Sequence, residues 1–146
     1  MKKDIPLICL FSLSFFALCR AQTQTSQADL LKSTVFNWDK LVMQKTPNGE
    51  RVMIVNAPTS TLSRLHVHAT TLNAGQASGA PRLHTQEELI IIKSGTVEVY
   101  CDGKTTMAEA GSIIFFAAHS TTAQRNLGKV PATYYVINYD NGAKKE

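Results

Sequence analysis

Three side chains that could bind a ligand or a metal ion stand close together near the middle of the sequence. Arg82, His84 and Glu88 are separated by even numbers of residues, so in an extended strand they would point to one face. A carboxylate and an imidazole on one face can form a hydrogen-bonded pair, contribute to a metal site or bind a polar ligand. The spacing therefore predicts that these three side chains meet on one face of the chain.

Other side chains of the same chemical types are weaker candidates. His66 and His68 alternate along one β-like run and could form an adjacent site, but alternate histidines on a half-exposed strand are more often ordinary surface. Cys101 continues the alternation of Val97 and Val99. We therefore expect Cys101 to be a small core residue rather than a nucleophile.

Several common chemistries are excluded by missing motifs. The sequence contains no GxxxxGK phosphate loop, no GxSxG nucleophile elbow and no CxxC pair. Lys and Arg total 15 against 11 Asp and Glu, a net charge of +4. The basic residues are not clustered, as they would be on a surface that binds nucleic acid, so we expect no nucleic-acid partner.

Residues 1–21 have the pattern of a secretory signal peptide. Two lysines precede a nearly uncharged run, Ile5–Leu18, which is shorter than the roughly 20 residues that span a bilayer. Cys19-Arg20-Ala21 supplies a cleavage site, so the mature chain would begin at Gln22. A lipid anchor on Cys19 is disfavoured because the preceding residue, Leu18, is bulky. We expect an exported protein, periplasmic or secreted, without membrane attachment after cleavage.

Short β-like runs must position the candidate side chains. Glycine and proline breaks separate seven of them: Arg51–Val55, Leu65–Leu72, Glu88–Lys93, Thr96–Cys101, Ser112–Phe116, Thr121–Asn126 and Ala132–Asn138. Pro47-Asn48-Gly49 adds a hairpin signal, and nothing after Leu41 has the pattern of a long helix. The pattern predicts an all-β sandwich or barrel. We divide the chain into a signal peptide (1–21), a flexible leader (22–33), one β domain (34–140) and a polar tail (141–146).

Two of these runs are apolar on both faces. Leu89–Ile92 and Ile113–Phe116 contain no polar residue, whereas a strand with one solvated face alternates. One set of side chains can fill a barrel, and the other needs a cover, either an N-terminal arm around Trp38 or a partner subunit. We therefore expect a homodimer.

The stretch from Gly79 to Gly95 resembles the first conserved motif of the cupins. That motif is a glycine, five residues, His-x-His, three or four residues, Glu, six residues and a glycine. Gly111 opens, and Asn126 closes, a stretch that resembles the second motif. The chain is most similar to small, exported, single-domain type-2 cupins. The resemblance implies a double-stranded jelly-roll β-barrel with a short N-terminal arm and an internal pocket.

In metal-binding cupins the two motifs supply three histidines and one glutamate to a divalent ion. By this resemblance His84 matches the second histidine of His-x-His and Glu88 matches the glutamate, while Arg82 stands at the first histidine. Thr122 stands at the histidine of the second motif, and His119 lies three residues before it. His119 could complete a set with His84 and Glu88 only if its turn bends inward.

Three functions remain open from the sequence. The first is a metal-free barrel that binds a small polar ligand, sugar-like or carboxylate-bearing, through Arg82, His84, Glu88 and Thr122. In this barrel Arg82 would pair with Glu88 and replace the positive charge of the ion. The second is a metal-dependent oxygenase or isomerase, with Fe, Mn, Ni or Zn held by His84, Glu88 and His119. The third is a structural dimer with a closed barrel. We expect no cofactor under the first function and one divalent ion under the second.

Overall fold

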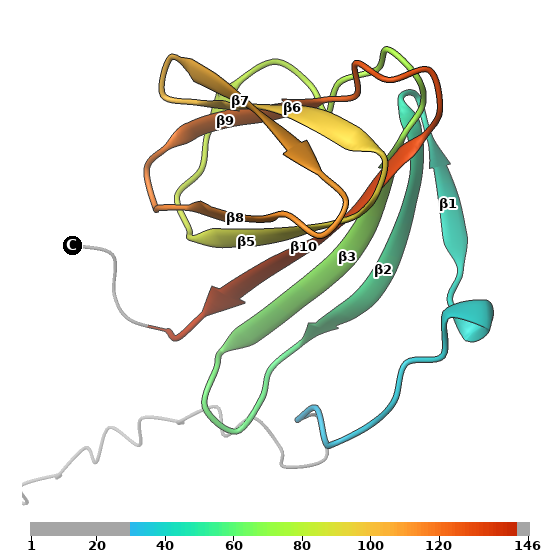
Figure 1. The fold of residues 1–146 in the computed structure, drawn as a ribbon. Helices are drawn as coiled ribbons and strands as arrows, with labels where there is room; N and C mark the ends of the chain where they lie inside the picture. Colours follow the sequence, from blue (N-terminus) through green and yellow to red (C-terminus); the bar gives the residue numbers. More distant parts are fainter. Residues whose placement is uncertain (1–29, 143–146) are drawn as a thin grey trace, which may run out of the picture.

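Two antiparallel sheets face each other in the computed structural model, which describes residues 30–142 (Figure 1). The larger sheet has the order β1-β2-β3-β10-β5-β8 and the smaller one the order β4-β9-β6-β7. After a 3-10 turn at Trp38–Lys40, the strands are β1 (Met43–Thr46), β2 (Gly49–Ala57), β3 (Arg64–Leu72), β4 (Arg82–Leu83), β5 (Glu88–Ser94), β6 (Thr96–Cys101), β7 (Lys104–Glu109), β8 (Ile113–Phe116), β9 (Thr121–Arg125) and β10 (Ala132–Asp140). This arrangement is the predicted jelly-roll barrel.

The core lies between the sheets and follows the alternation of the strands. In β5 the inward residues are Glu88, Ile90 and Ile92, and in β10 they include Tyr134 and Val136. Because successive side chains point to opposite faces, each strand contributes every second residue to this interior. The buried apolar cluster comprises Leu72, Ile90, Ile92, Val97, Val99, Ala108, Phe116, Ala132, Tyr134 and Val136.

Tight turns join neighbouring strands of the barrel. Gly95, between β5 and β6, has φ +77°, and a Cβ atom there would lie 2.8 Å from the Ala132 Cβ atom, so only glycine fits this position. Asp102 and Gly103 both have positive φ and connect β6 to β7. Two adjacent residues with positive φ are typical of a type I′ hairpin, which favours the Asp-Gly sequence found here.

All seven predicted strands are present, and three more were missed. β1 and β7 are exposed strands at sheet edges, with mostly polar sequences such as Lys-Thr-Thr-Met-Ala-Glu in β7. β4 has two residues. Edge strands need little apolar character because one side lacks a neighbouring strand, so these segments gave no hydrophobic signal. The predicted hairpin at residues 47–49 is confirmed, since Thr46 pairs with Gly49.

The outer face of the larger sheet is partly covered by the N-terminal arm. The Trp38 ring meets Tyr135 edge-on at 6.2 Å, and the Lys93 Nζ atom lies 4.0 Å above the Trp38 ring. At the far edge of the same face, Ile113 and Phe115 of β8 remain 68% and 60% exposed. The arm therefore supplies one part of the predicted cover and leaves β8 open.

No helix within residues 30–142 has the length and apolar character that a membrane crossing requires.

Candidate ligand-binding cavity

A polar cavity of about 450 Å³ lies inside the barrel. All four predicted pocket residues line it: Arg82, His84, Glu88 and Thr122. Further polar side chains on its walls are Arg51, His68, Thr70, Gln124 and Tyr134. A second hollow of about 410 Å³ shares Arg51, His68, Arg82, His84 and Glu88 with the first and adds Arg64, His66 and Asn138. These shared walls join the two hollows into one site, which opens toward Arg64.

The four predicted residues reach the cavity from both sheets. Arg82 in β4 stands directly opposite Thr122 in β9, whereas Glu88 begins β5 of the larger sheet. His84 lies in the connection between the sheets, where its backbone N–H donates to Ser120 O at 3.0 Å. The expectation that one extended strand would align residues 82, 84 and 88 is therefore wrong, because the chain crosses between sheets. The three side chains nevertheless line one cavity.

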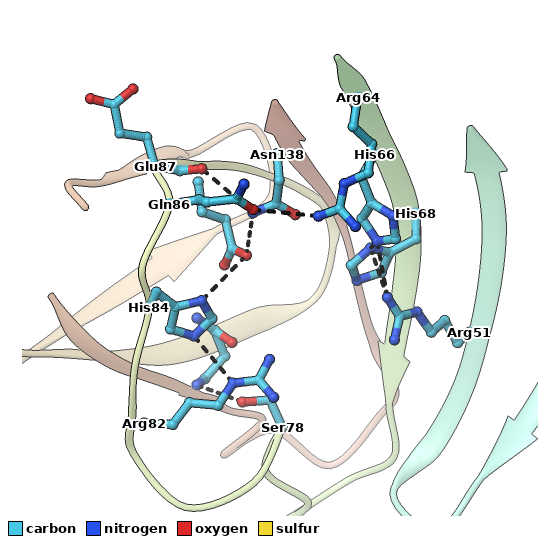
Figure 2. Close-up of polar contacts among 12 residues, drawn as sticks. Arg51, Arg64, His66, His68, Ser78, Arg82, His84, Gln86, Glu87 and Asn138 are labelled. Carbon is cyan, nitrogen blue, oxygen red and sulfur yellow. Dashed lines mark hydrogen bonds and ion pairs between the residues drawn. The ribbon is translucent and has the colours of Figure 1, made fainter. Parts of the chain in front are cut away.

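Arg82, His84 and Glu88 form a relay rather than a direct pair, with the His84 ring between the other two side chains. Figure 2 shows the contact between Arg82 and His84. The Nε–H of Arg82 donates to His84 Nε2 at 3.3 Å. Because Nε2 accepts, the ring proton is assigned to Nδ1, which lies 3.9 Å from Glu88 Oε2. Asn138 Nδ2 donates to the same carboxylate oxygen at 2.9 Å. The imidazole thus stands where the sequence suggested a direct Arg82–Glu88 contact.

Thr122 provides an unused polar group inside the cavity. The residue is 2% exposed, and its Oγ1 atom has no hydrogen-bond partner. A buried hydroxyl without a partner is costly unless something else satisfies it. The nearby Tyr134 is also buried, and this burial, reinforced by the charge of Glu88, raises the pKa of its phenol. The phenol of Tyr134 is therefore protonated at neutral pH, and both hydroxyl groups are able to donate.

A cluster of Arg51, His66 and His68 forms the opposite wall; the sequence raised an adjacent site at the two histidines only as an alternative, and it did not indicate Arg51. Arg51 Nη2 lies 3.1 Å from His68 Nδ1 and 3.3 Å from His66 Nε2, while His66 Nδ1 lies 3.2 Å from Asn56 Oδ1. Burial, followed by the charge of Arg51, lowers the pKa of His68 to about 3. Burial also lowers the pKa of His66, helped by Arg64 and Arg51. Both rings are neutral at pH 7 and accept from the guanidinium.

The expectation that His66 and His68 are ordinary surface residues is therefore wrong. Their strand, β3, lies between β2 and β10 in the larger sheet, so its inner face looks into the barrel. Arg51 could have been found from its setting, because it is the one arginine or lysine of β2, whose following residues are largely apolar. A charged residue within a buried apolar strand needs a partner or a ligand.

His119 does not join the other candidate metal ligands. It is exposed, has φ +68° and lies in the turn before β9, and it is absent from the residues that line either hollow. Its backbone N–H donates to His84 O, but this turn leaves its side chain outside the cavity. The inward bend that a third ligand required is therefore not present.

The cavity residues do not fit a divalent ion. No group of three or more His, Cys, Asp or Glu side chains within residues 30–142 is arranged to hold a metal. The Nε2 lone pair of His84 already accepts from Arg82, and a metal beside that guanidinium would be repelled by its charge. The donor set of this site is suited to hydrogen bonding rather than to metal coordination.

A larger hollow of about 650 Å³ lies between β7 and β8 and is mainly apolar. Cys101 lines it as a free thiol. Burial and the neighbouring Asp102 carboxylate raise the pKa of the Cys101 thiol, which opposes thiolate formation. This agrees with the expected structural role of Cys101.

Part of the chain matches a known family, and the whole fold is similar to solved structures. The family model described as "Cupin domain" matches residues 68–138. An RmlC-like cupin from Shewanella frigidimarina is similar in structure, with a TM-score of 0.61 at 15% identity over 76% of this chain and 95% of that chain. KdgF from Halomonas sp. has a TM-score of 0.61 at 16% identity, over 73% of this chain and 94% of that chain. A predicted oxalate decarboxylase from Thermotoga maritima has a TM-score of 0.59 at 16% identity, over 73% of this chain and 98% of that chain.

At these identities the solved structures establish the fold alone. No curated protein matches the chain in sequence.

Proposed function

Because this chain is a small cupin-domain protein, we propose that it is a binding protein whose barrel cavity holds a small polar ligand without a metal ion. Arg82, His84, Glu88 and Thr122 would contact that ligand. The ligand would be sugar-like or carboxylate-bearing, since the walls offer both charged donors and carboxylate or hydroxyl acceptors.

The observation that carries this proposal is the Thr122 hydroxyl. It is almost completely buried, lines the cavity and lacks a protein partner. Buried polar atoms in native proteins nearly always have a partner, and a ligand or water supplies the missing one when the protein does not. A ligand hydroxyl or carboxylate at Thr122 would meet this need.

We further propose that the protein acts outside the cytoplasm as a homodimer. Export is supported by the signal-like composition of residues 1–21, which lie outside the described residues. Dimer formation is supported by the exposure of Ile113 and Phe115 on β8, because a partner would remove this apolar surface from water.

The proposal is tested by titrating the mature protein with D-gluconate and with D-sorbitol. These two molecules share a six-carbon polyhydroxy chain, and only gluconate carries a carboxylate. Binding of either one should shift the backbone amide NMR signals of Thr122 and Gln124, and the shifts should diminish in Thr122→Val. Thr121→Val is the control, since Thr121 immediately precedes Thr122 in β9 and is absent from the cavity walls. Absence of cavity shifts with both molecules would contradict the proposal.

The second candidate is a divalent-metal-dependent enzyme of the oxygenase or isomerase type. Its support is that His84 and Glu88, which stand at metal-ligand positions of the first cupin motif, both line the cavity, although no third ligand joins them among the described residues. One structurally similar protein is a predicted oxalate decarboxylase. This candidate predicts that ligand binding in the cavity disappears after dialysis against EDTA and returns with added Fe, Mn, Ni or Zn. The metal-free proposal predicts unchanged binding.

A further inference from the structure

We infer that the ligand of this cavity is a small monocarboxylate whose carboxylate is held between the guanidinium groups of Arg51 and Arg82. This inference rests on the proposed function and narrows its ligand to one chemical class. It follows from the charges, the hydrogen bonds and the placement of the two arginines.

Arg51 is a partly buried cation without a carboxylate partner. None of the ion pairs formed among residues 30–142 includes Arg51. Its Nη2 atom contacts only the two imidazoles, and its Nε atom is buried without any hydrogen-bond partner. Desolvating a guanidinium without a counter-charge is unfavourable, so an anion in the cavity would stabilise this arrangement.

The histidines orient Arg51 without neutralising it. A carboxylate in place of His66 or His68 would accept the same hydrogen bond and would also cancel the positive charge. Two neutral imidazoles instead hold Nη2 at 3.3 Å and 3.1 Å and leave the charge for a ligand. His66 is itself held by Asn56, which fixes its ring orientation.

The acidic side chains of the cavity are already engaged elsewhere. Glu88 accepts from Asn138 and faces the His84 ring, which in turn accepts from Arg82. Glu50, at the other end of the cavity, forms an ion pair with Lys45. Of the two cavity arginines, Arg82 is thus balanced by Glu88, and Arg51 is in excess. Within the inner cavity, which Arg64 does not line, one positive charge is unbalanced and calls for a ligand with one negative charge.

The positive charges of Arg51 and Arg82 affect the same part of the barrel interior. Figure 2 shows Arg51 with His68 on one side of the view and Arg82 with His84 on the other. Two buried groups, His68 and Tyr134, each have their pKa lowered by the positive charges of both arginines, although burial raises the pKa of Tyr134 overall. The positive potential of both side chains therefore converges beside His68 and Tyr134.

The free donors match the needs of a carboxylate. Arg82 uses its Nε–H on His84, which leaves its terminal N–H groups for a ligand, and the buried Nε–H of Arg51 has no partner in the protein. The unpartnered Thr122 hydroxyl stands directly opposite Arg82 across the β4–β9 pair. Guanidinium groups bind carboxylates with strong, charge-assisted hydrogen bonds, and Arg64 adds positive charge at the opening.

The test compares gluconate with sorbitol, using the side-chain Nε–Hε NMR signals of Arg51 and Arg82. Gluconate should shift both signals and bind at least about tenfold more tightly than sorbitol. Arg51→Gln should remove this preference, and Arg125→Gln should keep it, because the Arg125 side chain is exposed on β9 outside the cavity. Arg82→Gln, at an exposed position of a two-residue strand, should also weaken the preference and serves if Arg51→Gln fails to fold.

The outcomes separate this inference from the proposed function. Sorbitol bound in the cavity as tightly as gluconate would overturn the inference and leave the proposed function standing. A gluconate preference that survives both Arg51→Gln and Arg82→Gln would also overturn it. If neither molecule shifts the cavity signals, the inference and the proposed function both fail.

Discussion

At Thr122 a buried hydroxyl without a partner should destabilise the unliganded fold. Valine has nearly the same shape and lacks the hydroxyl, so it would remove the unsatisfied atom without opening a cavity. We expect Thr122→Val to raise the free energy of unfolding of the unliganded protein by about 1 kcal/mol in urea titrations. Thr121 is less buried than Thr122, so Thr121→Val should give no comparable gain in the free energy of unfolding. A clear loss of stability in Thr122→Val would mean that the hydroxyl has a partner in the free protein.

His68 makes a separate prediction about pH. Its pKa is lowered from 6.5 to about 3 in the folded protein, so between these pH values the unfolded state binds more protons than the folded state. Stability should therefore fall as the pH decreases below about 6.5. His68→Gln keeps an acceptor for Arg51 and cannot protonate. Urea unfolding at pH 7 and pH 5 should show a larger loss for the wild type than for His68→Gln, and equal losses would contradict this assignment.

The sequence predicted four residues of the site, raised His66 and His68 only as the less favoured alternative of an adjacent site, and missed Arg51. Arg82, His84, Glu88 and Thr122 were found because their spacing resembles known motifs, and they do line the cavity. Arg51, His66 and His68 carry no motif, and their role depends on the pairing of β2 with β3, where Met53 pairs with His68 and Arg51 with Thr70. Contacts between strands far apart in sequence cannot be derived from residue spacing within one strand.

At the scale of strands, the pairing of β4 with β9 explains how the two motifs meet. Arg82 pairs directly with Thr122, and such cross-strand neighbours have Cβ atoms about 5 Å apart. Histidines at both positions, together with His84 and Glu88, would supply four ligands around one point. We expect the double variant Arg82→His with Thr122→His to gain tight Ni or Zn binding by calorimetry.

The parent protein is the control for this double variant and should bind neither ion tightly. Tight binding of one equivalent by the parent would show that Arg82 does not exclude a metal. Failure of the double variant to bind would show that β4 and β9 do not bring the two positions together as described.

Strand existence was predicted best where both faces are apolar, as in β5 and the edge strand β8, and worst in the polar or very short edge strands β1, β4 and β7. β5 and β8 were recognised as strands because each has apolar side chains both on the face toward the core and on the outer face. β1, β4 and β7 lie at the ends of their sheets, where hydrogen bonding to a single neighbour and the turn residues define the strand. The Asp102-Gly103 turn fixes β7 against β6 without requiring an apolar pattern.

For the whole molecule, the exposed apolar surface of β8 predicts self-association. We expect light scattering at micromolar concentration to give the mass of a dimer. Phe115→Lys should shift the equilibrium toward monomer, because a charge in the interface would lose its hydration. Val130→Lys is the control, since Val130 is comparably exposed at 64% but lies in the loop before β10. A monomer mass for the wild type across this range would refute the prediction.

Export can be tested on the intact chain. Protein recovered from outside the cytoplasm should begin at Gln22, because Ala21 is the small residue that ends the signal-like segment. Intact mass spectrometry measures this directly. A diacyl adduct on Cys19, or a chain that retains residues 1–21, would contradict the prediction.

The proposed function depends on a cavity that binds its ligand without a metal ion. Elemental analysis of the purified mature protein tests this most directly, because it requires no knowledge of the ligand. The relay from Arg82 through His84 to Glu88 predicts Fe, Mn, Ni and Zn at far less than one atom per chain. One equivalent of any of these metals, retained through purification, would contradict the metal-free binding function and favour the enzyme.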